Sequence, residues 1–124
     1  MPLPFYRNII MTSGINTIER GFAMQRLQSI QAKYLRGLAH PLKPIVFIGQ
    51  KGLTLEVINS TEAALNKHEL IKLKFNDFKE KPRKQEICRI IEEKTGCRLV
   101  GTIGNIAILY REHRDPEKRK IQLP

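Results

Sequence analysis

Two glycines flank a lysine in the stretch "IGQKGLT", and this spacing could bind phosphate. Between an apolar run and a segment of helical periodicity stand Gly49, Gln50, Lys51 and Gly52. A glycine lacks the Cβ atom that would hold a ligand away from main-chain amides, and Lys51 adds a positive charge. The helix that follows would present free N–H groups and the positive end of its dipole. Two interpretations stay open, a plain turn and a cradle for phosphate.

The loop does not match the known nucleotide-binding motifs. A Walker loop requires G-x-x-x-x-G-K-[ST], but Leu53 and Thr54 follow the second glycine, and G-x-G-x-x-G does not fit either. The sequence shows no paired carboxylates in an apolar setting and no nucleophile with an evident base. We therefore expect a protein that is not an enzyme and uses no cofactor. The alternative is a small enzyme or nucleotide binder that holds a free phosphate in this loop.

The cysteines and histidines do not suggest a metal site. Cys88 and Cys97 are nine positions apart, and neither belongs to a C-x-x-C motif, whereas zinc needs four ligands at recognisable spacing. Without a secretion signal we expect reduced thiols, with Cys88 packed in the core. We expect His68 to be half-buried on the core side of its helix. The sequence therefore predicts no metal.

The charge is strongly positive and unevenly distributed. Residues 1–52 hold seven basic residues and one acid, Glu19, and so carry +6 of the net charge of +10. Such an excess favours a polyanionic partner, and we favour nucleic acid over an anionic membrane. Surplus charge that serves only solubility is the third interpretation.

Aromatic residues make up 6% of the chain and tryptophan is absent. The aromatic signature of RRM domains is also missing, so contacts to backbone and shape are expected to outweigh base stacking. A G-x-x-G loop is the device with which KH domains clamp a nucleic-acid backbone. The cations and the histidine just upstream of the loop strengthen this interpretation: Lys33, Arg36, His40 and Lys43.

The first half of the chain predicts a helix and a strand after an extension. Residues 1–23 show no sustained period, and Met24 stands where an alternative start could lie. Helical spacing over 24–38 gives one apolar stripe, formed by Leu27, Ile30, Tyr34, Leu35 and Leu38. After Pro44, the continuous apolar run 45–48 predicts a strand covered on both faces.

The middle of the chain predicts helix, strand and helix. Thr54 can cap a helix whose core face holds Val57, Ile58, Thr61, Ala64, Leu65 and His68. Alternation in "ELIKLKFND" places Ile71, Leu73 and Phe75 on one face of a strand, with Lys72 and Lys74 on the other. A third helix starts near Pro82, carries Ile87, Ile90 and Ile91, and ends at Gly96.

The last two strands predict a hairpin with a two-residue turn of the primed type at Gly104 and Asn105. That register places Ile103 opposite Ile106 and Val100 opposite Leu109. The order is helix, strand, helix, strand, helix, strand, strand. It predicts a single α/β (α+β) domain over 24–111, with helices packed on a mixed four-stranded sheet and a basic tail over 112–124. No apolar run reaches the ~20 residues of a membrane span, and we expect a cytoplasmic protein.

Four stretches in order carry a resemblance to a known family: "LRGLAHPLKPIVFIGQKGLT", "ALNKHELIKLKF", "IGNIAILYR" and "KRKIQLP". Together they resemble the CRM domain (chloroplast RNA splicing and ribosome maturation), especially the bacterial stand-alone YhbY-like RNA-binding proteins. The resemblance covers about residues 27–123 and leaves out 1–23. It implies a fold akin to the C-terminal domain of bacterial translation initiation factor three. It also implies binding to precursors of the large ribosomal subunit during assembly.

The resemblance also implies which residues contact RNA. Gly49, Gln50, Lys51 and Gly52 occupy the family's loop, and "GLAHPLKP" holds His40, Pro41 and Lys43 just after Arg36. With Lys33 these residues form the predicted RNA-binding set. Our leading hypothesis is a monomeric, non-enzymatic RNA-binding protein of ribosome biogenesis. A protein-interaction module on the ribosome is a further alternative.

Overall fold

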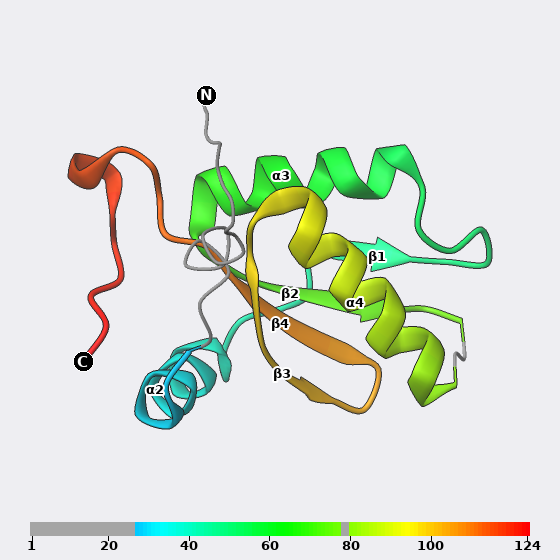
Figure 1. The fold of residues 1–124 in the computed structure, drawn as a ribbon, viewed down its shortest axis with the longest axis horizontal. Coiled ribbons are helices and arrows are strands. Elements are labelled where there is room, and N and C mark those ends of the chain that lie inside the picture. The colour runs from blue at the N-terminus through cyan, green and yellow to red at the C-terminus, as the bar shows by residue number, and fades with distance from the viewer. Residues whose placement is uncertain (1–26, 78–79) are drawn as a thin grey trace, which may run out of the picture.

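The computed structural model describes residues 27–77 and 80–124, and Figure 1 shows their arrangement. The chain runs through α2 (Ser29–Ala39), β1 (Val46–Ile48), α3 (Leu55–His68), β2 (Leu70–Phe75), α4 (Lys81–Thr95), β3 (Arg98–Ile103) and β4 (Ile106–Tyr110). A 3-10 turn, η1 (Pro116–Lys118), follows in the tail. The predicted order of elements and the single α/β domain are confirmed. The expected extension 1–23 and Met24 lie outside the described residues.

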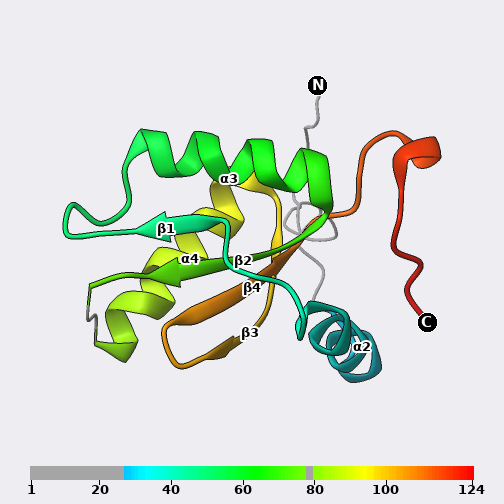
Figure 2. The ribbon, with the colours of Figure 1, turned by 180° about the vertical axis from the view of Figure 1, so that it is seen from behind.

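The sheet has the strand order β1-β2-β4-β3. β1 and β2 are parallel neighbours joined through α3, whereas β4 pairs antiparallel with both β2 and β3. α3 and α4 cover one face, and α2 packs against β2, β3 and β4 at one end of the other face (Figures 1 and 2). The mixed four-stranded sheet is confirmed, and the two faces are covered to very different extents.

The larger core lies under α3 and α4. The predicted alternation of β2 is confirmed, because Ile71, Leu73 and Phe75 are buried there while Lys74 is exposed on the opposite face. Thr54 caps α3 as predicted, since its hydroxyl accepts the amide of Val57 at 3.2 Å. His68, however, is exposed, and this prediction was wrong. The helix ends at His68, so the buried position beside the sheet passes to the next residue.

That next residue, Glu69, holds the C-terminal tail in place. It has a left-handed backbone (φ +64°), and its side chain is almost fully buried. Its carboxylate accepts the amides of His113 at 2.8 Å, Lys120 at 2.7 Å and Ile121 at 3.2 Å. These hydrogen bonds satisfy a buried charge with backbone donors, which is the usual condition for burying one. The sequence pattern gave no sign of this anchor.

The smaller core lies between α2 and the sheet. Buried Leu35 and Ala39 of α2 meet Val100 and other buried strand residues, and Ile121 of the tail packs against the same cluster. The predicted apolar stripe was too wide, because Ile30, Tyr34 and Leu38 are exposed. The helix meets only the end of the sheet, so Leu35 and Ala39, together with the partly buried Ala32, are enough to make the contact.

The strand β1 contradicts the prediction of a strand covered on both faces. Val46 and Ile48 are buried, but Phe47 is 48% exposed and the preceding Ile45 is 46% exposed. β1 lies at the edge of the sheet, and α2 does not reach over this part of the face. An apolar run of four residues does not reveal whether one or two layers will cover it.

The β3–β4 hairpin follows the prediction at its turn and departs from it further along. Ile103 pairs with Ile106, and only Gly104 of the two turn residues has positive φ (+58°), the pattern of a type II′ turn. Leu99, rather than Val100, pairs with Leu109. A β-bulge removes Val100 from the ladder, and this side chain packs in the smaller core under α2.

Candidate nucleic-acid interface

The loop between β1 and α3 is a tight turn. The amide of Gly52 donates to the carbonyl of Gly49 at 3.0 Å, and Gly52 is left-handed (φ +73°). This is a β-turn with glycine at its fourth position, a common place for glycine. A side chain at Gly52 would be strained, so the second glycine of the motif is required by the backbone. Gly49 has ordinary φ and open space around its Cα.

The same turn exposes amides beside a positive charge. Gln50 and Lys51 are exposed, and their amides donate to no acceptor among the described residues. Successive free amides of a turn form a concave site for an anion. The amide of Gly52 is already used within the turn. The loop is therefore a turn, and two free amides next to the Lys51 ammonium also give it the chemistry of a phosphate site.

Arg83 lies beside this loop and was not in the predicted set. A Cβ atom placed on Gly52 would lie 3.7 Å from Nη2 of Arg83, which belongs to the first turn of α4. The first turn of α4 contains no acid but carries basic residues, although a helix N-terminus favours negative charge. This unfavourable placement is the one sequence signal that could have identified Arg83. We call Gln50, Lys51, Gly52 and Arg83 the loop group.

The remaining predicted residues lie near α2 and form a second group: Lys33, Arg36, His40 and Lys43. All four are exposed. Lys72 fixes the connector between α2 and β1, because its ammonium donates to the carbonyls of His40 at 3.3 Å and Leu42 at 2.9 Å. Figures 1 and 2 show α2 and the β1–α3 loop at opposite ends of the molecule. The structure thus divides the predicted set into this α2 group and the loop group.

An uncovered part of the sheet connects the two groups. Phe47, Lys74, Ile106 and Ile103 stand side by side in register across all four strands, so their side chains share one face. Phe47, Lys74 and Ile103 are exposed. One step nearer α2, the amide of Ile45 donates to the carbonyl of Lys72 at 3.1 Å. We call Ile45, Phe47, Lys74, Ile103 and Ile106 the open sheet face.

The charges along this surface have one sign. From Leu27 to Leu55 the sequence contains Lys33, Arg36, Lys43 and Lys51 and no acid. Arg36 lies against the sheet, because a Cβ on Gly101 would meet its Cδ at 3.6 Å. Two acids elsewhere have structural partners: Glu62 binds Arg111 at 2.8 Å, and the carboxylate of Glu92 accepts the amide of Leu99 at 2.8 Å. The surface from α2 to the loop therefore suits a polyanion.

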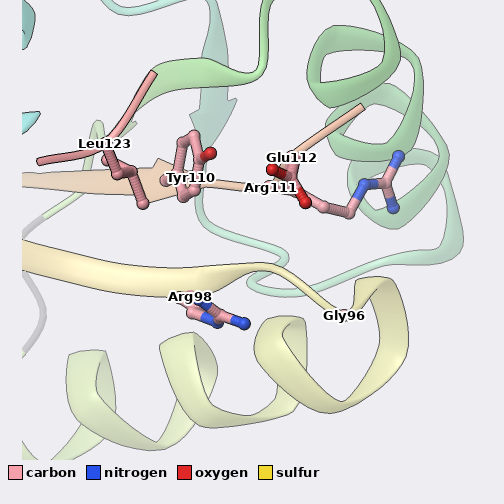
Figure 3. A pocket seen from close by; sticks show the side chains of 6 residues that line it. All are labelled: Gly96, Arg98, Tyr110, Arg111, Glu112 and Leu123. Carbon is pink, nitrogen blue, oxygen red and sulfur yellow. The ribbon is translucent and has the colours of Figure 1, made fainter. Parts of the chain in front are cut away.

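A recess of about 230 Å³ lies between Arg98 of β3, β4, the end of α4 and the tail (Figure 3). Arg111 points away from it toward α3 and is bound to Glu62 and Asn66, while Glu112 contributes a carboxylate to the wall. Burial raises the pKa of Tyr110 to about 12, so this phenol is neutral. The recess is the seam along which the tail packs.

The cysteines are structural, as predicted for Cys88. Cys88 and Cys97 are both buried, and burial raises the pKa of each thiol to about 11. Both are therefore protonated and unreactive at neutral pH. Among residues 27–77 and 80–124, no group of three or more His, Cys, Asp or Glu side chains could hold a metal. None of the helices described in the structure has the length and apolar character needed to cross a membrane.

These features define a small α/β domain whose exposed basic loop, at a helix N-terminus, suits a phosphate backbone. The chain belongs to the family of the CRS1 / YhbY (CRM) domain, whose sequence model matches residues 27–111. This result confirms the family that the four sequence stretches resemble. The match begins just before α2 and ends just after β4, and so includes the loop group, the α2 group and the open sheet face.

Similar proteins carry names that refer to RNA. The chain is 45% identical over 101 residues to an RNA-binding protein of Haemophilus influenzae, covering 82% of this chain and 98% of that protein. It is 34% identical over 94 residues to a probable RNA-binding protein of Bacillus subtilis, covering 76% and 95%. A solution structure from Staphylococcus aureus, described as a candidate RNA-binding protein, superposes with a TM-score of 0.65 at 34% identity. It covers 79% of this chain and 99% of that one.

Proposed function

We propose that this protein binds RNA, without catalysing a reaction, through the loop group and the α2 group. The observation that carries the proposal is the turn at 49–52, where two free amides lie beside Lys51 and Arg83. Backbone amides and cations hold phosphates in any sequence, so these contacts would give affinity and orientation rather than base specificity. The relatives that are named as RNA-binding proteins support the same partner.

We further propose ribosomal RNA within precursors of the large subunit as the target, bound by a monomer in the cytoplasm during ribosome assembly. The +10 charge and the separation of the two cationic groups support a large, extended polyanion over a mononucleotide. A mononucleotide carries its phosphates at one point, whereas an RNA strand can contact the loop and α2 together. Calorimetry with mononucleotides should then show only weak binding at moderate salt.

Replacing Lys51 with Ala tests the loop. Binding to ribosomal RNA fragments should weaken by a similar factor for all sequences, and the dependence of log K on log salt should flatten by about one contact. Fluorescence anisotropy between about 50 and 200 mM salt gives both quantities. Lys94→Ala is the matched control, because this exposed lysine lies in the last turn of α4, remote in sequence from Arg83. Equal losses of RNA affinity in both variants would show that the effect comes from net charge alone and not from the loop.

The assembly role needs a cellular experiment. Ultraviolet crosslinking followed by sequencing of the attached RNA should recover large-subunit ribosomal RNA, and gradient sedimentation should place the protein in precursor fractions. The Lys51→Ala variant should shift toward free protein at the top of the gradient. Recovery with messenger or transfer RNA alone would contradict the assembly role and leave RNA binding intact.

A further inference from the structure

Phe47 occupies an unusual position for a large aromatic residue. It stands in the middle of β1 and is 48% exposed, and the residues before and after it in the strand, Val46 and Ile48, are buried. Across the sheet its neighbour in register is Lys74, followed by Ile106 and Ile103. Ile103 is 64% exposed, so the row is open at both edges of the sheet. The core does not require an aromatic ring at this position.

We propose that the open sheet face is a stacking platform for an unpaired base of the bound RNA, with Phe47 as the stacking surface and Lys74 as the contact to its phosphate. This inference rests on the proposed function and gives it a substrate class: single-stranded RNA, or a base that has left its helix. Aromatic side chains on exposed sheets stack bases of any type, because every base has a flat π face.

The position of the ring relative to the loop supports this. Phe47 precedes Gly49 by two residues, which is about 7 Å along a strand. A strand whose phosphate lies against the amides of Gln50 and Lys51 would therefore place a neighbouring base over Phe47. In the other direction, Ile45 leads to the connector that carries Lys43 and His40. The open sheet face thus completes a continuous path between the loop group and the α2 group.

The chemistry of the surface favours RNA over a protein partner. Lys74 interrupts the apolar row at its second position, and the flanking cations are not balanced by any acid between Leu27 and Leu55. The cores of protein–protein interfaces are depleted in lysine and rely on larger apolar areas. An exposed aromatic ring with a lysine as its cross-strand neighbour instead matches single-strand nucleic-acid sites, which combine aromatic stacking surfaces with positive charge.

Substitutions at Phe47 separate stacking from general apolar contact. For a short single-stranded RNA, Phe47→Ala should weaken binding about tenfold, Phe47→Leu nearly as much, and Phe47→Tyr very little. The salt dependence should not change, because no phosphate contact is lost. Blunt duplex RNA of the same length should bind all four proteins equally. Ile30→Ala is the matched control, since Ile30 is 61% exposed but lies in the first turn of α2.

A spectroscopic test reports stacking directly. The chain has three tyrosines but no tryptophan, so Phe47→Trp introduces a single tryptophan on the platform, whose emission can be excited apart from that of the tyrosines. Saturating single-stranded RNA should quench its emission, whereas an abasic oligonucleotide with the same sugar-phosphate backbone should bind without comparable quenching. Equal quenching by both strands would overturn the stacking role.

The outcomes distinguish the two proposals. If Lys51→Ala weakens RNA binding and Phe47→Ala does not, the platform is wrong and the proposed function stands. If neither substitution matters, the RNA interface itself is wrong. A Phe47→Leu variant that binds single strands as tightly as the parent protein overturns stacking in favour of apolar contact. If Phe47→Ala abolishes binding to a protein partner and leaves RNA affinity unchanged, the stacking role is overturned in favour of a protein-binding surface. Thermal unfolding of each variant verifies that the fold is kept.

Discussion

The two faces of the sheet differ in what covers them, although the same strands build both. On the closed face, two helices bury Ile71, Leu73 and Phe75 almost completely. On the opposite face, α2 and the tail cover one end and leave Phe47 and Lys74 exposed. The alternation of side chains along β2 is therefore not a measure of burial. The alternation only assigns side chains to one face or the other. The helices that pack on the sheet decide which face is buried and which stays exposed.

The largest effect on stability should come from the closed face. Leu73→Ala removes a side chain with no exposed surface and leaves a cavity between the sheet and the helices, at a cost of about 2–5 kcal/mol in the free energy of unfolding. Phe47→Ala, on the open face, should cost well under half as much because solvent already reaches the ring. Urea denaturation measures both changes. Similar losses for the two variants would break the distinction between the faces.

Removing the anchor of the tail should have an intermediate effect. Glu69→Ala leaves the partly buried amides of His113, Lys120 and Ile121 without their acceptor and should cost about 1–3 kcal/mol. Hydrogen exchange should accelerate in the tail, where Ile121 and Leu123 cover part of the smaller core. Glu69→Gln keeps one acceptor oxygen and should lose less.

The control for the tail is Glu117→Ala, because this exposed carboxylate lies in η1, away from Glu69. Exchange rates that stay unchanged in Glu69→Ala would show that the tail is held by its apolar contacts alone. If the exchange rates in the tail rise as expected, the loosened tail exposes more of the face opposite α3 and α4, at the end where α2 lies. The contrast with the closed face then becomes larger.

The smallest effect concerns the two buried thiols of the closed face and appears only at high pH. Burial raises the pKa of Cys88 and Cys97 from 9 to about 11, so folding favours the protonated form. Their contribution to stability is complete below pH 9 and is lost as pH rises through about 11. At neutral pH the free energy of unfolding should not depend on their ionisation. A thiol reagent at pH 8 should therefore react only as fast as the protein unfolds, which absorbance at limiting denaturant can measure.

Much of the fold could be predicted because it depends on local rules. Residue type alone favours the observed conformation at three positions: Thr54 before α3, Gly96 after α4 and Gly104 in the hairpin. The alternation of β2 likewise identified the buried side of the central strands. Features set by distant neighbours were missed. A bulge moved Val100 out of register, and Glu69 binds amides more than 40 residues away.

The candidate interface shows the same division. The loop at 49–52 was recognisable because glycine spacing at a strand-to-helix junction is local information. Arg83 was not, because its approach to Gly52 depends on how α4 packs beside the loop. The prediction for 45–48 failed for a related reason, since an apolar run does not show that β1 lies at the edge of the sheet.

The sequence by itself determined the order of the elements, the turn at Gly49–Gly52 and the excess of positive charge, because backbone conformation and composition are properties of neighbouring residues. Only the tertiary structure decided which surfaces are covered. It placed β1 at an edge, α2 over one end of a face and Arg83 beside the loop, because packing brings together residues that are far apart in the chain. The exposure of Phe47 follows from that packing.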